Sequence, residues 1–318
     1  MALSKLSGDE QGIILGQLRN TLEPRLAMYF SSASTELRAL LTPAVRQQLR
    51  ADYEVAAALC VKMGRGSCAG LRGAKAVFCR NRGLSAADLA TLGLLGSVLP
   101  ALKELTLENS PDAAGPDGVQ RLVEGWVAGA LPAVIHLNIC DMHVGEAGAS
   151  ALAAALDRGA LPRLRILCLT YTAIGDAGLV VLAPTLQRRP VLEALYLGGN
   201  PCGDEGLAAL VPPLPPAGAP PLPPDGLKKL KELNLDETQV SDAGCAALAA
   251  ALDSGALPAL RDLMRAGIPA SAAARVAVRE AMARSRAVAI ARAERAAMAE
   301  SAAPESEAAA PAGASGSS

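Results

Sequence analysis

The sequence has few of the residues that enzymes and nucleic-acid-binding surfaces commonly use. Only two of its 318 residues are histidine and only 2% are aromatic, which leaves little for histidine acid–base catalysis or for base stacking. The 30 Lys plus Arg are balanced by 31 Asp plus Glu, so net charge does not favour binding to nucleic acid or to an anionic membrane. No apolar run approaches the roughly 18 residues that span a bilayer. We therefore expect no nucleic-acid partner and no membrane segment.

Motifs for catalysis and cofactor binding are also missing from the sequence. It has no His-Glu-x-x-His, no phosphate-binding G-x-x-x-x-G-K-[ST] and no G-x-S-x-G. Residues 64–69 match a G-x-G-x-x-A string, but they follow a helical segment, so we interpret them as a helix stop and linker. We expect His136, Cys140 and Cys168 to lie near one another, yet a zinc site would need at least one further ligand. The sequence predicts a protein that is not an enzyme and holds no metal or cofactor.

The seven cysteines indicate the cellular compartment of the protein. Their number is odd and no Cys-x-x-Cys pair occurs, which indicates free thiols in a reducing compartment. We therefore expect a cytoplasmic protein.

An internal repeat dominates the rest of the chain. Residues 149–164 (ASALAAALDRGALPRL) and 245–260 (CAALAAALDSGALPAL) are identical at 12 of 16 positions. Seven short apolar alternations of the form L-x-x-L-x-L begin at intervals of 28, 32, 30, 28, 38 and 30 residues. The seven ladders start at Ala74, Leu102, Val134, Leu164, Leu192, Leu230 and Leu260. A fixed period of this length predicts stacked structural repeats.

Each repeat has the same predicted order of strand, turn and helix. The period-2 alternation predicts a short strand, and apolar residues at helical spacing predict the helix that follows. We expect Asp176, Asp204 and Asp242 to cap the N-termini of the helices in which they lie. Gly159 and Gly255, each followed by a proline, are typical helix stops.

These residues resemble leucine-rich repeats of the ribonuclease-inhibitor-like class, over about residues 71–269. The resemblance implies an α/β solenoid shaped as a horseshoe, with a parallel sheet on the concave face and helices on the convex face. Two features depart from the family pattern. The asparagine that usually follows the strand is present only as Asn200, and the last ladder has Arg265 at an apolar position, which suggests a partly exposed terminal repeat.

The flanks and one insertion do not follow the repeat. Residues 1–70 predict three short helices and a longer one at about 43–60, which we interpret as a helical cap. Residues 270–300 predict a helix whose first turns cover the end of the solenoid through Val276, Val278 and Met282, and residues 301–318 are expected to be disordered. The insertion at 212–226 contains Pro-Pro-Leu-Pro twice and resembles a ligand of WW-type domains, although a tolerated loop insertion explains it as well.

The predicted concave face is the candidate binding site. Residues between the ladder leucines should point to the open side of the sheet, where acidic side chains surround a small apolar anchor. We expect a basic surface on a protein partner to bind there. The candidate contact residues are Phe78, Glu104, Thr106, Glu108, His136, Asn138, Ile166, Cys168, Tyr196, Glu232, Asn234, Asp236 and Asp262.

Three functions remain open from the sequence. The first is a monomeric, non-enzymatic interaction scaffold. The second is an F-box-type substrate receptor of a ubiquitin ligase, because the N-terminus is similar to a degenerate F-box, although its Leu-Pro opening is missing. The third is a regulator of a small GTPase, because Ran GTPase-activating proteins share this repeat class. The F-box-like residues are Asp9, Ile14, Leu15, Leu18, Leu22, Pro24, Leu26 and Ser31.

Overall fold

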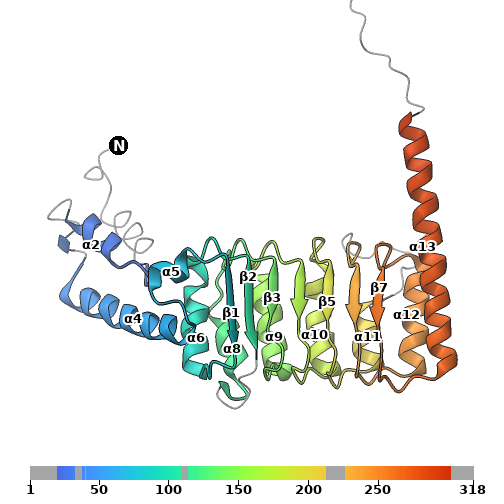
Figure 1. The fold of residues 1–318 in the computed structure, drawn as a ribbon, viewed down its shortest axis with the longest axis horizontal. Helices are drawn as coiled ribbons and strands as arrows, with labels where there is room; N and C mark the ends of the chain where they lie inside the picture. Colours follow the sequence, from blue (N-terminus) through green and yellow to red (C-terminus); the bar gives the residue numbers. More distant parts are fainter. Residues whose placement is uncertain (1–19, 33–37, 40, 109–113, 213–225, 302–318) are drawn as a thin grey trace, which may run out of the picture.

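A single parallel sheet of seven strands forms one side of the molecule and helices form the other (Figure 1). The computed structural model describes residues 20–32, 38–39, 41–108, 114–212 and 226–301. The strands are β1 Ala76–Arg80, β2 Glu104–Glu108, β3 His136–Asn138, β4 Ile166–Cys168, β5 Ala194–Tyr196, β6 Glu232–Asn234 and β7 Asp262–Met264. Between them lie α6 Ala86–Leu94, the 3-10 helix η2 Leu95–Val98, α8 Gly118–Glu124, α9 Gly145–Asp157, α10 Asp176–Gln187, α11 Asp204–Leu210 and α12 Asp242–Ser254.

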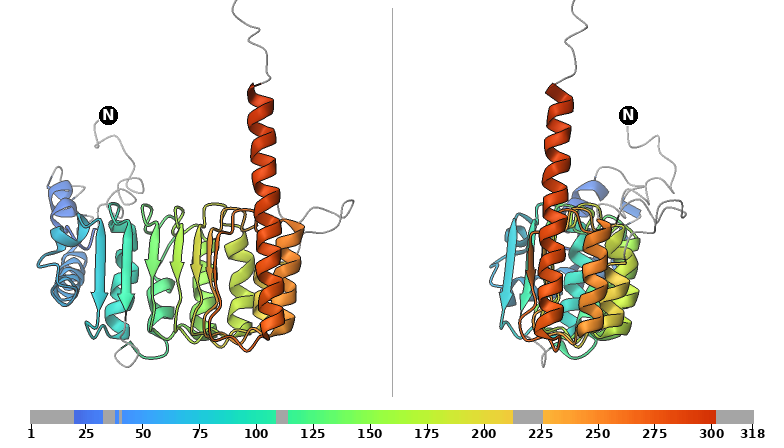
Figure 2. Two further views of the ribbon diagram at one scale, coloured as in Figure 1. Left: turned by 45° about the vertical axis from the view of Figure 1, so that its right-hand side comes forward. Right: turned by 90° about the vertical axis from the view of Figure 1, so that its right-hand side faces the viewer.

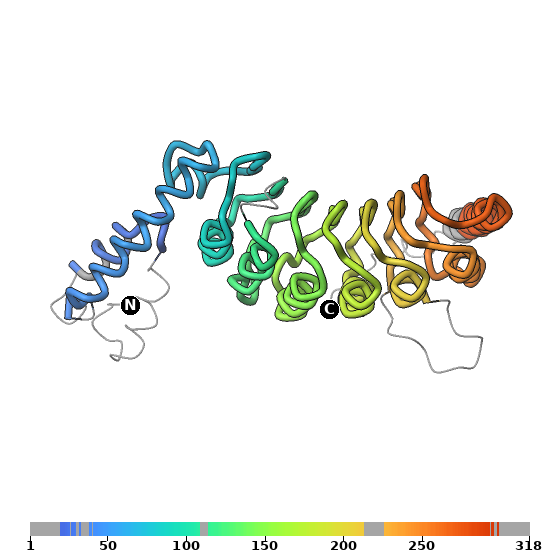
Figure 3. The backbone as a smooth tube through the Cα atoms, turned by 90° about the horizontal axis from the view of Figure 1, so that it is seen from below, coloured from blue at the N-terminus to red at the C-terminus, as the bar shows by residue number. Residues whose placement is uncertain are grey.

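The strands follow one another in chain order, and each pairs with its neighbours in parallel. The residue two places after each ladder start lies opposite its counterpart, as Glu104 does to His136 and His136 to Ile166. Figure 3 shows the repeats in a shallow arc with the strands on its inner side. The predicted α/β solenoid is confirmed.

Apolar side chains from neighbouring repeats form one continuous core between the sheet and the helices. Ladder residues such as Leu137 and Leu167 are fully buried, and so are helix residues such as Leu152 and Leu182. The same cluster of contacts extends from the N-terminal helices to the last helix. Each repeat therefore buries its apolar side against the next, as the period predicts.

Asn200 fixes the loops that follow β4 and β5. Its Oδ1 accepts hydrogen bonds from the backbone N–H groups of Thr172 and Ile174 at 3.1 and 3.0 Å. Its Nδ2 donates to the carbonyl oxygens of Leu169 and Leu197 at 2.6 and 2.8 Å. The side chain is 1% exposed, so these bonds satisfy backbone groups that water does not reach.

The aspartates of the first helical turns act differently from the prediction. Asp176 accepts hydrogen bonds from Gly203 N and Gly206 N, and therefore caps α11, the helix of the following repeat. Asp204 likewise accepts from Ser241 N and Gly244 N at the start of α12. Asp242 accepts from the backbone N–H of Ser271, immediately before the last helix. The prediction that each caps its own helix was wrong, because the first turn of one helix lies beside that of the next.

Helices cover both ends of the solenoid. At the N-terminal end lie α2 Arg25–Ser31, α4 Pro43–Lys62 and α5 Cys68–Arg72. The stop predicted at residues 64–69 is present, since α4 ends at Lys62, but α5 already begins within that segment.

At the C-terminal end, α13 Ala272–Ser301 packs on α12 and then extends past the edge of the repeats (Figures 1 and 2). Val278 and Met282 are buried there as expected, but Val276 is 37% exposed and does not cover the core. Arg265 is half-buried in the last repeat and donates to the carbonyl oxygen of Arg275.

Some predicted segments lie outside the described residues. These are the four F-box-like residues before Asn20 (Asp9, Ile14, Leu15 and Leu18), nearly all of the proline-rich insertion and the C-terminal tail after Ser301. Within the described part of the chain, no helix is long and apolar enough to cross a membrane.

We predict that Asn200→Ala lowers the free energy of unfolding by about 3 kcal/mol, because it leaves several buried backbone groups without partners at a cost of about 1–3 kcal/mol each. Urea denaturation measures the change. Asn138→Ala is the matched control, since Asn138 is only half-buried and accepts a bond from Cys140 N inside its own loop. An equal loss in both variants would contradict the role assigned to Asn200.

Candidate protein-binding surface

The candidate contact residues lie in three rows on the open side of the sheet, at the third, fifth and seventh ladder positions. Those at the third ladder position pair across the strands, and so do those at the fifth. Phe78 is 50% exposed, whereas Thr106 is only 2% exposed. The short side chain of Thr106 lies between Phe78 and Asn138 of the adjoining strands, and the larger neighbours shield it. Thr106 is therefore not available for contact, contrary to the prediction.

Acidic residues of the first repeats already have side-chain partners within the sheet. Arg80 Nε lies 2.7 Å from a carboxylate oxygen of Glu108. His136 Nδ1 lies 3.1 Å from a carboxylate oxygen of Glu104. Asn138 adds a long amide contact to Glu108 at 3.5 Å. The carboxylate of Glu108 is therefore paired with a cation of the protein itself, and that of Glu104 is in contact with a histidine.

The later repeats hold a tyrosine and carboxylates that lack such counter-charges. The hydroxyl of Tyr196 donates a hydrogen bond to Glu232. Burial, followed by this bond to Glu232, raises the pKa of Tyr196 to about 12. Asp262, on the next strand, is exposed and adds negative charge nearby. Neither Glu232 nor Asp262 forms an ion pair with any residue that the structure describes.

A second tyrosine, Tyr171, lies over the loops that follow the strands. Its hydroxyl donates to Glu237 Oε2 at 2.5 Å, which spans two repeats. Gly199 lies directly beneath the ring, so that a side chain there would collide with it. The bond to Glu237 raises the pKa of Tyr171, with Asp141 and Asp236 also contributing negative charge. Tyr171 is 51% exposed and is the largest aromatic surface at this edge.

We define Tyr171, Tyr196 and the carboxylates around them as the tyrosine–carboxylate cluster. Its carboxylates are Asp141, Glu232, Asp236, Glu237 and Asp262. Asp236 and Asn234 are partly used inside the protein, because Asp236 Oδ1 accepts from Ala266 N and Asn234 Oδ1 accepts from Asp236 N. Asp141, Glu237 and Asp262 are the exposed carboxylates of the cluster.

Basic residues line the N-terminal ends of the strands in the same sheet. They occupy the second ladder position of five repeats, namely Lys75, Lys103, Arg165, Lys231 and Arg261. Glu193 pairs with two of them, Arg165 and Lys231. The basic residues therefore lie at the N-terminal ends of the strands, where Glu232 and Asp262 directly follow Lys231 and Arg261, whereas Asp141, Asp236 and Glu237 lie beyond the C-terminal ends of the strands.

Two thiols lie in the middle of the surface, beside Ile166. Cys168 Sγ is 3.4 Å from Thr170 Oγ1. The neighbouring Cys140 thiol lowers the pKa of Cys168 to about 6, although burial opposes this, and Thr170 lowers it further. His136 is turned to Glu104 and does not join them. Among the described residues, no group of three metal-ligating side chains is present.

Comparison with known proteins identifies the repeat. A family model described as "Leucine Rich repeat" matches residues 190–211 and 226–249, which include β5, β6 and the starts of the helices that follow them. The solenoid is built of leucine-rich repeats. No curated protein sequence matches the chain.

Two solved structures resemble the leucine-rich repeat solenoid at low identity. One is leiomodin-1 actin-binding site 2, with 16% identity and a TM-score of 0.42, covering 59% of this chain and 97% of that one. The other is an internalin (inlF) from Listeria monocytogenes, with 14% identity and a TM-score of 0.37, covering 70% of this chain and 58% of that one.

The sequence reasoning missed the residues at the eighth ladder position of the leucine-rich repeats. This position has a left-handed backbone in every described repeat: Asn81, Asp141, Tyr171, Gly199, Glu237 and Gly267. The frequent Asn, Asp and Gly there are the available signal, since these residues tolerate positive φ best. Tyr171 and Glu237 depart from that preference, and they are the two that bond to each other.

We predict that Cys168 reacts with iodoacetamide faster than the other thiols of the repeats at neutral pH. Alkylation needs the thiolate, so a lowered pKa moves the rise in rate to lower pH. Mass spectrometry of alkylated peptides over a pH series measures this. Cys202 is the control, because burial raises its pKa to about 11. In Cys140→Ala the rise should move to higher pH, and an unchanged profile would contradict the effect assigned to Cys140.

Proposed function

We propose that the protein is a non-enzymatic scaffold that binds a basic segment of a protein partner on the concave face of its leucine-rich repeats. The observation that carries the proposal is the tyrosine–carboxylate cluster. Its five carboxylates have no ion-pair partner among the described residues, unlike Glu104 and Glu108. A cluster of this kind favours cationic ligands through long-range attraction.

The arrangement suits an arginine or lysine side chain. The half-exposed ring of Tyr171 offers an aromatic face for a cation. Carboxylates beside that ring accept charge-assisted hydrogen bonds, which are about twice as strong as neutral ones. The hydrogen bond to Glu237 holds the ring in place before a partner arrives, so less conformational entropy is lost on binding.

The basic edge gives the partner an orientation. Lys75, Lys103 and Arg261 are exposed at the N-terminal edge of the strands. A partner that carries acidic residues beside its basic segment would form ion pairs with these three basic side chains. Like charges in the reversed orientation would repel, which favours one direction of docking.

We also propose the division of the chain that the sequence suggests: a helical cap over residues 1–70, the repeats over 71–269, the helix over 270–300 and the tail over 301–318. The observed elements support the inner boundaries, since β1 begins at Ala76 and α13 at Ala272. A WW-type partner at 212–226 remains a prediction from the sequence.

Neutralising the cluster tests the proposed function. Peptides selected from a random phage-displayed library on the wild-type chain should be enriched in Arg and Lys. The triple variant Asp141→Asn, Glu232→Gln, Glu237→Gln should bind them about tenfold more weakly, and rising salt should weaken wild-type binding.

The control variant also loses three negative charges, but from the helices on the convex side of the solenoid. It is Glu124→Gln, Glu146→Gln, Glu205→Gln, three exposed carboxylates of α8, α9 and α11. This control should bind like the wild type. Selected peptides without basic residues, or equal losses in both triple variants, would refute the proposal.

A further inference from the structure

A groove in the N-terminal cap is separate from the concave face. Helices α2 and α4 lie beyond β1, at the far end of the solenoid (Figures 1 and 3). A small core of Ala27, Leu41 and Leu49, with Val45 packed against it, holds the two helices together. The C-terminal half of α4 belongs instead to the main core, through Leu59. The cap is thus anchored to the repeats while its outer part forms a surface of its own.

Between α2 and α4 the surface is hollowed into a cavity of about 530 Å³. Its apolar walls include Pro24, Met28, Pro43 and Tyr53, of which Met28 is 54% and Tyr53 39% exposed. This volume lies within the range of about 300–1,000 Å³ typical of ligand sites. The apolar exposure is concentrated where two helices meet, which is the geometry that accepts a third helix.

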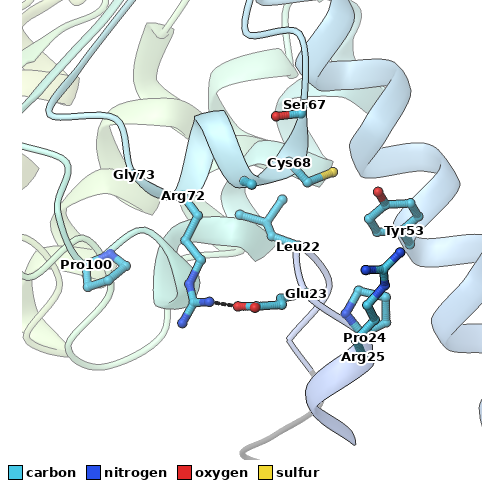
Figure 4. Close-up of a pocket in the computed structure, with 11 residues that line it drawn as sticks. Leu22, Glu23, Pro24, Arg25, Tyr53, Ser67, Cys68, Arg72, Gly73 and Pro100 are labelled. Atoms are coloured by element: carbon cyan, nitrogen blue, oxygen red, sulfur yellow. Dashed lines mark ion pairs between the residues drawn. The ribbon is translucent and has the colours of Figure 1, made fainter. Parts of the chain in front are cut away.

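A second cavity adjoins the first at Pro24 and Tyr53 and has a volume of about 740 Å³. Figure 4 shows Tyr53 and Pro24 on one side of it and Arg72 of α5, paired with Glu23, on the other. Arg25 also lines this cavity. Pro24 and Tyr53 are thus shared by the two cavities, which we treat together as one groove.

The charges along the groove are positive. Arg46 and Arg50 line it one helical turn apart, and neither forms an ion pair with a described residue; nor does Arg25. Glu23 is the one carboxylate among the lining residues, and it is neutralised by Arg72. Arg46 Nε donates to the carbonyl oxygen of Leu41, which holds its guanidinium at the rim. An acidic ligand is therefore complementary to this groove.

We propose that the groove between α2 and α4 binds an amphipathic, acidic helix of a protein partner. The apolar face of that helix would cover Met28 and Tyr53, and its acidic residues would pair with Arg46 and Arg50. This surface is independent of the concave face and takes ligands of the opposite charge.

A pair of synthetic peptides tests the proposal on the full chain. The first is a fluorescein-labelled helix of about 18 residues with leucines on one face and glutamates flanking them, and its twin has lysine in place of every glutamate. Fluorescence anisotropy should show saturable binding of the acidic peptide below about 100 µM and binding of the twin at least about tenfold weaker. Equal affinities, or no saturation by the acidic peptide, would overturn the proposal.

Variants locate the contact. Arg46→Glu with Arg50→Glu should weaken binding of the acidic peptide by more than about tenfold, and Arg46→Gln with Arg50→Gln by a smaller factor without adding negative charge. Arg279→Glu with Arg286→Glu, two exposed arginines of α13, makes the same change in net charge as the first variant and should leave binding unchanged.

Neutralising the tyrosine–carboxylate cluster should not affect this peptide either, which separates the two surfaces. Unchanged binding in both Arg46/Arg50 variants would place the peptide elsewhere and overturn the assignment.

Discussion

The burial of apolar side chains between adjacent repeats is the interaction on which the rest of the structure depends. A strand and a helix such as β3 and α9 cannot cover Leu137 and Leu152 by themselves, and a buried leucine contributes about 1.5–3 kcal/mol only when the next repeat lies beside it. The sheet, its arc and its open side all follow from this stacking. So do the helices at the ends, because α4 and α13 cover apolar surface that no further repeat would bury.

The repeat could be predicted from sequence because its signal is local and recurs seven times. Every ladder start is buried and every strand pairs in the predicted register. The polar contacts could not be predicted, because their partners lie one or two repeats away. Asp204 reaches the start of α12, and Tyr171 reaches Glu237 across 66 residues. The spacing of residues within one repeat indicates neither of these contacts.

The same limit applies to charge. The acidic residues of the sheet look equivalent in the sequence, yet Glu108 faces an arginine on the adjacent strand, whereas Glu232 faces a tyrosine hydroxyl. A tyrosine donates a hydrogen bond without cancelling the negative charge. The position of the cation-binding surface that we propose therefore depends on which strand lies beside which.

The two proposed surfaces are connected by packed helices and strands. Helix α4 contributes Leu49 to the small cap core and Leu59 to the main core, so one continuous helix joins the cap to the repeats. The tyrosine–carboxylate cluster is fixed in turn by the ladder of backbone bonds from Tyr171 to Gly198 and from Gly199 to Asp236. Ligands of opposite charge would be held at a set distance, and neither site requires the other to be occupied. If both proposals hold, the stacked repeats separate two binding surfaces that select ligands of opposite charge.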